Sequence, residues 1–217
     1  MTSSTQVPEL EIDDSAESAI DWVKAHARQV GVGAIALAAL AGVLWIVRNQ
    51  NEGNETAASR QLVSAQRSVG AGNLPLASAD LRKLADRYGS TRAGTEAKVL
   101  LAQVLLQQNK APDALKLLDE IGTGGTTAAS VHGLKAAALE QTGKPAEAAE
   151  EYLKAAAANP LKGEAESLKA DAARAYVAAG RKADALKIWQ EMAANPASVL
   201  YNEAMLRVGE LMAQVQK

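Results

Sequence analysis

The sequence predicts an all-α protein: one N-terminal transmembrane helix, then an α-solenoid of about four helix pairs and a C-terminal capping helix. Three observations predict this class. A run of eighteen residues, Val30 to Val47, carries no charge. After it, a helix–turn–helix pattern recurs four times, at spacings of 34 to 37 residues. Phe is absent and aromatic residues make up 3% of the chain, so the core must pack Leu, Val and Ala, which suits close helix contacts better than a sheet.

The N-terminal tail, residues 1–29, is polar and mostly acidic, with six acidic residues and two basic ones before Val30. Its second half predicts a short amphipathic helix. Asp14 is the expected N-cap, and Glu17 stands three residues later in a capping-box arrangement. Ile20 and Val23 then share one face of that helix.

Residues 30–48 predict the transmembrane helix. A run of about eighteen uncharged residues crosses most of a ~30 Å hydrocarbon layer, and Arg48 can extend its charge to the headgroups. One alternative is a buried helix of a globular domain, but such helices normally keep a polar stripe and this segment has none. Another is a cleaved signal peptide, but its leader would be short and basic, whereas this one is long and acidic.

Small residues form a stripe on the predicted membrane helix. Ala34, Ala38 and Gly42 are four residues apart on one face. Such a stripe lets a second helix approach closely, so these residues are the candidates for helix packing within the membrane. A polar linker is expected at residues 49–57, and the repeat domain at 58–217.

Each repeat has landmarks at fixed distances from a turn. A small residue stands seven positions before the turn residue, an Ala five after it and a large apolar residue nine after it. The turn residues are Gly72, Asn109, Gly143 and Gly180; the small ones Ala65, Ala102, Ala136 and Ala173; the Ala positions Ala77, Ala114, Ala148 and Ala185; the large ones Leu81, Leu118, Tyr152 and Trp189. Small residues let paired helices cross closely while the large residue fills the gap between them. A last segment repeats the first-helix pattern with Gly209 at the small position, and is expected to be the closing cap.

These landmarks resemble the tetratricopeptide repeat from Thr56 to the C-terminus. The layout of a short tail, one membrane helix and about four repeats further resembles the YfgM-like family of ancillary subunits of the SecYEG translocon. That resemblance implies a single-pass protein of the bacterial inner membrane, with a cytoplasmic N-terminus and a periplasmic repeat domain. It implies translocon subunits, periplasmic chaperones or unfolded chains as partners, with a chaperone-like role. The alternative is a structural accessory subunit of another bacterial membrane protein complex.

No catalytic constellation is present in the sequence. The "TGKP" segment at Thr142 lacks the first Gly of a phosphate loop, because Ala138 stands there. His26 and His132 are far apart and show no metal-ligand spacing. Cys is absent and the net charge is −2. We therefore expect no enzyme activity, no cofactor, no metal, no small-molecule substrate and no nucleic-acid partner.

Protein binding is the remaining function, and the concave surface lined by the first helices is its expected site. Counting from the turns predicts the following partner-binding residues: Leu62, Gln66, Val69, Val99, Gln103, Leu106, Gln107, Glu140, Gln141, Arg174 and Val177. Their mixture of Leu, Val and Gln suits apolar segments of an unfolded or helical chain, held weakly.

Overall fold

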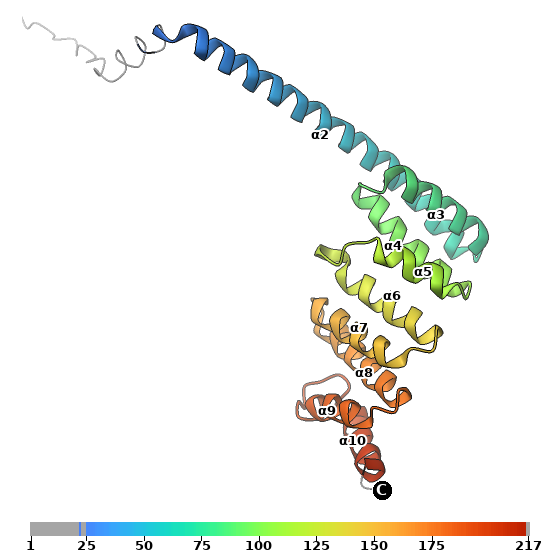
Figure 1. Cartoon of the computed structure of the whole chain (residues 1–217). Helices are drawn as coiled ribbons and strands as arrows, with labels where there is room; N and C mark the ends of the chain where they lie inside the picture. The colour runs from blue at the N-terminus through green and yellow to red at the C-terminus, as the bar shows by residue number, and fades with distance from the viewer. Residues whose placement is uncertain (1–21, 23–24, 216–217) are drawn as a thin grey trace, which may run out of the picture. The chain divides into compact units, whose positions relative to one another are not determined.

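The computed structural model describes residue 22 and residues 25–215 (Figure 1). All regular secondary structure in this part of the chain is helical. The chain divides into two compact units, Met1–Glu52 and Gly53–Lys217, which are described separately. The amphipathic helix expected to begin at Asp14 lies outside the described residues, apart from Trp22 and the residues from Ala25 onward.

The apolar run near the N-terminus belongs to helix α2, Ala27–Gly70. Its side chains at Val32, Leu40 and Trp45 are exposed. Within the described residues, no helix reaches both the length and the apolar character required of a membrane span. The transmembrane helix expected at residues 30–48 is therefore not confirmed. The expected linker at 49–57 is also helical, because α2 continues through it without a break.

The second unit is a stack of helix pairs, and Figure 1 shows the pairs following one another in chain order. The C-terminal part of α2 pairs with α3, and α10 is the last helix of the described residues. The bounds are α3 Leu74–Tyr88, α4 Arg92–Gln107, α5 Ala111–Asp119, the short 3-10 helix η1 Gly125–Thr127, α6 Ala128–Gln141, α7 Pro145–Ala158, α8 Lys162–Ala178, α9 Lys182–Ala193 and α10 Tyr201–Val215. This confirms the predicted solenoid.

All four predicted turn residues have positive φ angles. Gly72, Gly143 and Gly180 have φ of 74°, 75° and 76°, and Asn109 has 58°. Glycine and asparagine tolerate this left-handed region better than other residues. The residue after each turn residue donates its N–H to a carbonyl five residues earlier, as Arg181 does to Tyr176 at 2.8 Å. This is the Schellman arrangement, which satisfies carbonyl groups at a helix end.

The predicted packing landmarks lie in two apolar cores. The first core holds Leu81 and Leu118 and extends from Ala58 on α2 to Ala138 on α6. The second holds Trp189 and extends from Ala136 to Leu211. Tyr152 alone among the large residues is only half-buried. Its hydroxyl donates to Glu140 at 2.9 Å, and burial together with that carboxylate raises the pKa of Tyr152.

A carboxylate on α2 joins the first helix pair to the second. Glu55 accepts the backbone N–H of Arg92 at 2.8 Å and that of Ala93 at 3.0 Å. These N–H groups lie in the first turn of α4 and have no acceptor within the helix, and the helix dipole favours a negative charge there. Glu55 and α4 are 37 residues apart in sequence, so this contact is a tertiary one.

Candidate functional site

A continuous groove runs over the first helices α2, α4, α6 and α8. It consists of two adjoining hollows of about 370 and 500 Å³. Both hollows are lined by Val99, Gln103 and Ser130, so they form one surface. Gln66 contributes from α2, and Leu134 and Leu168 contribute from α6 and α8. We call these six residues and the surface between them the first-helix groove.

Apolar side chains from three helices line the first-helix groove. Val99, Leu134 and Leu168 are half-buried there, while Gln103 and Ser130 are exposed beside them. Gly133 widens the groove, because a Cβ at this position would meet only Leu168 Cδ2, at 4.0 Å.

Charged side chains also lie along the first-helix groove. Glu164 of α8 lines it and accepts a hydrogen bond from the side-chain amide of Asn159 at 3.1 Å, and the others form ion pairs. On α4, Arg92 and Glu96 are 3.1 Å apart. On α8, Arg174 contacts Asp171 at 2.7 Å and Glu203 of α10 at 3.0 Å. A surface with apolar side chains, neutral hydrogen-bonding groups and no unpaired basic group among those named suits a polypeptide segment better than a phosphate or a nucleic acid.

The structure places the predicted binding residues in several environments. Gln66, Val99 and Gln103 line the first-helix groove. Arg174 and Val177 line a separate cavity of about 220 Å³ beside α10. Gln107 is exposed and Val69 packs against the first core.

Two more predicted residues make contacts within the solenoid. Glu140 is the partner of the Tyr152 hydroxyl. Gln141 donates its side-chain amide to the carbonyl of Leu106 at 3.3 Å, a contact between neighbouring repeats. These side chains bridge helices at the turn end of the array.

Leu62 and Leu106 require a correction. Their exposed fractions are 5% and 7%, and both belong to the first core. Neither can serve as a binding residue, because each packs inside the solenoid. Conversely, counting from the turns missed Gly133, Leu134 and Leu168. A glycine inside a helix is unfavourable by about 1 kcal/mol relative to alanine, and the one at position 133 was the signal that could have located them.

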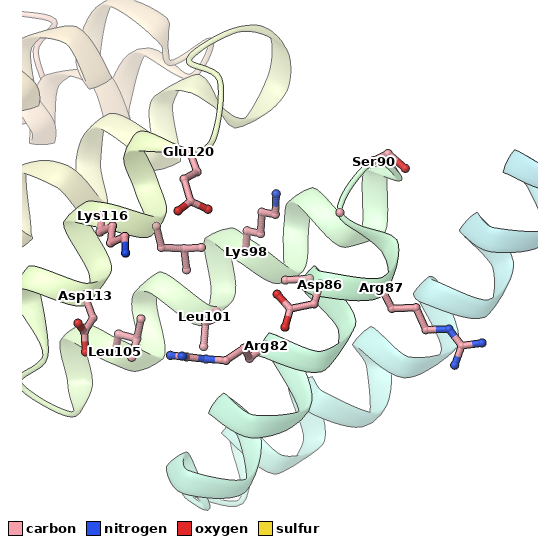
Figure 2. A pocket seen from close by; sticks show the side chains of 13 residues that line it. Arg82, Asp86, Arg87, Ser90, Lys98, Leu101, Leu105, Asp113, Lys116 and Glu120 are labelled. Atoms are coloured by element: carbon pink, nitrogen blue, oxygen red, sulfur yellow. The ribbon is translucent and has the colours of Figure 1, made fainter.

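A second cleft, of about 700 Å³, lies among α3, α4 and α5. Figure 2 shows side chains of both charges around it, including Arg82, Asp86 and Lys98. Its floor includes the core residues Leu101 and Leu105. Acidic and basic groups alternate along its walls, so the cleft presents no region of a single charge to an anionic or cationic ligand.

Among the described residues, no cluster of side chains suited to a metal ion is present. They contain no group of three or more His, Asp or Glu side chains that could hold a metal ion. A close contact joins α6 and α7, where His132 Nδ1 lies 2.6 Å from Glu151 Oε2. Burial raises the pKa of Glu151, but hydrogen bonds from Lys154 and His132 outweigh it and lower that pKa. This pair joins α6 to α7 and has no nucleophile beside it among its described contacts.

Comparison with known proteins agrees with this geometry. Residues 46–175 match the sequence profile of the tetratricopeptide repeat-like domain, which is more than half of the chain. The chain belongs to this family. Among curated proteins, none matches the sequence significantly.

Solved structures share the fold at low sequence identity. A protein of Podosopora anserina, described as a kinesin light chain with nearly identical TPR-like repeats, is 16% identical with a TM-score of 0.61. The match covers 75% of this chain and 89% of that one. A tetratricopeptide repeat protein from Parabacteroides merdae is also 16% identical, with a TM-score of 0.59, covering 73% of this chain and 61% of that one. At this identity the likeness shows the fold alone.

Proposed function

We propose that this tetratricopeptide-repeat protein is a membrane-anchored interaction scaffold that binds polypeptide segments in its first-helix groove. The observation that carries the proposal is the set of apolar side chains Val99, Leu134 and Leu168, which α4, α6 and α8 bring together in one hollow. Tetratricopeptide folds are generally scaffolds for protein interaction, which fits this use of the groove. The apolar contacts are few, so binding of an apolar segment is of order micromolar.

The membrane anchor in this proposal is the uncharged run Val30–Val47. It is supported by the sequence, which has the length of a bilayer-spanning segment. Lys24, Arg28 and His26 lie on its N-terminal side and Arg48 and the more distant Arg60 on the other, so the charge bias toward a cytoplasmic N-terminus is slight. The resemblance to the YfgM-like family supports the same orientation, with a periplasmic repeat domain. The full chain should stay in the membrane pellet after alkaline carbonate washing. Leu40→Arg should reduce insertion, because Arg at a helix centre costs about 2.5–3.5 kcal/mol; release of the unmodified chain by carbonate contradicts the anchor.

Within the membrane, we assign the protein to the protein translocon as an accessory that binds emerging chains or periplasmic chaperones. The support is its resemblance in layout to the YfgM-like family. A structural subunit of a different membrane complex is the second candidate, because Ala38 and Gly42 are exposed on α2 and no atom lies within 4 Å of a Cβ built at Gly42. Affinity purification in mild detergent separates the two. Translocon subunits in stoichiometric amounts support the first assignment, and another complex supports the second.

The first-helix groove is tested by filling it. Gly133→Leu places a side chain between Val99 and Leu168 and improves helix propensity, so the fold should persist. Binding of reduced, carboxymethylated α-lactalbumin to the purified full chain should weaken about tenfold, which is about 1.4 kcal/mol. The matched control is Gly53→Leu, another helical glycine with open space around it, on α2. Equal binding by wild type and the Gly133→Leu variant, with helicity retained, rejects the groove.

A further inference from the structure

The last helix, α10, leaves an apolar face open. Met205, Leu206 and Met212 are 52%, 61% and 44% exposed. Gly209 lies among them, with no atom within 4 Å of the position a Cβ would take. Positions 205, 209 and 212 share one side of a helix, and position 206 borders it. A helix that closes a solenoid normally presents a polar outer face, so α10 is not a conventional cap.

The repeat register shows what this face corresponds to in the earlier repeats. The residues equivalent to Gly209 are Ala65, Ala102, Ala136 and Ala173, each exposed by at most 1%. The residues equivalent to Met212 in the last three full repeats are Leu105, Leu139 and Tyr176, exposed by 2%, 8% and 6%. In those repeats the equivalent face lies in a core shared with the second helix of the pair. In α10 the same positions are bare.

We propose that the open face of α10 binds an amphipathic helix of a partner protein, in the position that a second helix takes in the preceding repeats. The internal repeats define the chemistry of that helix. Each second helix presents an Ala and, four residues later, a large apolar residue, as Ala185 and Trp189 do on α9. The small residue of the first helix leaves room, and the large residue fills it.

Met205 adds a restriction on the partner. Its equivalents in the two preceding repeats are His132 and Lys169, which pair with acidic residues of the second helices. His132 contacts Glu151 at 2.6 Å and Lys169 contacts Glu191 at 2.6 Å. A methionine cannot pair with a carboxylate, and burying an unpaired charge against it is costly. The partner helix therefore carries no charge opposite Met205.

A second copy of α10 fits this face less well than a partner helix does. A symmetric pair of copies centred on this face would place Gly209 against Gly209, whereas the fourth repeat combines the small Ala173 and the large Trp189 in one core. This surface is separate from the first-helix groove, and the test below does not depend on that groove.

The probe is a synthetic peptide of residues 180–195, the sequence of the last complete second helix. A lactam bridge between Lys187 and Glu191, which are four apart and exposed on α9, holds it helical and removes the charge that would face Met205. Fluorescence anisotropy measures its binding to the purified full chain. The expected dissociation constant is of order micromolar, as for other single helices held in apolar grooves.

Two variants of the chain and one control decide the outcome. Leu206→Asp with Met212→Asp, and separately Gly209→Leu, should each weaken peptide binding about tenfold or more. Gly209→Leu fills the face and also favours the helix. It therefore still tests whether the face binds the peptide if the double variant unfolds α10. Leu76→Asp removes a comparably exposed leucine from α3 and should leave binding unchanged.

Three results would overturn the proposal. The first is absence of peptide binding at concentrations up to about 1 mM. The second is equal binding by wild type and the Gly209→Leu variant. The third is a sedimentation mass of two copies for wild type and one for the variant, because the occupant of the face would then be a second α10.

Discussion

Truncation of Trp189 to alanine should destabilise the C-terminal half of the solenoid and leave the N-terminal half folded. Trp189 is the large residue of the fourth repeat and only 1% exposed. It packs in the second core with Ala185, Met192 and Leu211. Removing a fully buried Trp or Phe side chain typically costs about 3–5 kcal/mol, from the lost burial and the cavity left behind.

The expected shift in melting temperature follows from the size of the repeat unit. For domains of about 150–250 residues, 1 kcal/mol changes the melting temperature by about 2–4 °C. The repeat unit, Gly53–Lys217, falls in this range. Trp189→Ala should therefore lower the melting temperature of the full chain by about 6–20 °C, measured by circular dichroism at 222 nm.

The location of the effect is as informative as its size. In a repeat array each unit contacts only its neighbours, so stability is approximately a sum of local terms. Hydrogen exchange should show faster opening of α8, α9 and α10, while amides around Leu81 and Leu118 in the first core stay protected. The matched control is Trp45→Ala, because Trp45 is 68% exposed on α2.

The result that refutes this reasoning is an unchanged melting temperature for Trp189→Ala. It would mean that the tryptophan does not fill the gap between α8, α9 and α10. Equal loss of protection in both cores would instead refute the division of the solenoid into two packing clusters.

Two further perturbations test single features. Gly180→Ala should lower the free energy of unfolding by about 1–2 kcal/mol, because φ at this turn is 76°. Gly209→Ala, at an open helical position, should instead raise the free energy of unfolding by up to about 1 kcal/mol. Urea titrations measure both, and equal effects of the two variants would contradict the turn geometry. Hydrogen bonds from Lys154 and His132 hold the pKa of Glu151 below its ordinary value of 4.5, so its stabilising contribution is present above that pH and is lost as the pH falls through the folded-state pKa. Glu151→Gln should therefore make the melting temperature less dependent on pH below about 4.5, and an unchanged acid profile would contradict the assignment.

The sequence alone determined the repeat architecture, because each of its landmarks acts locally. A turn between helices needs a residue that tolerates positive φ, and only glycine or asparagine stands at those places. Residues four positions apart lie on one face of any α-helix, so Ala185 and Trp189 necessarily face the same neighbouring helix. Such constraints can be read without knowing how the pairs stack.

Only the tertiary structure decided which first-helix residues remain accessible. A change of one residue turns the side chain by about 100° around the helix, so a count from the turns cannot separate the groove from the core beside it. Leu62 and Leu106 were expected in the groove but are buried, because neighbouring helix pairs cover that side of α2 and α4. Leu134 and Leu168 come together beside Gly133 only when α6 stacks on α8. The exposed face around Gly209 is also decided by tertiary packing. The equivalent positions in the earlier repeats carry small residues too, but those are buried because a second helix packs on them, whereas Gly209 is open.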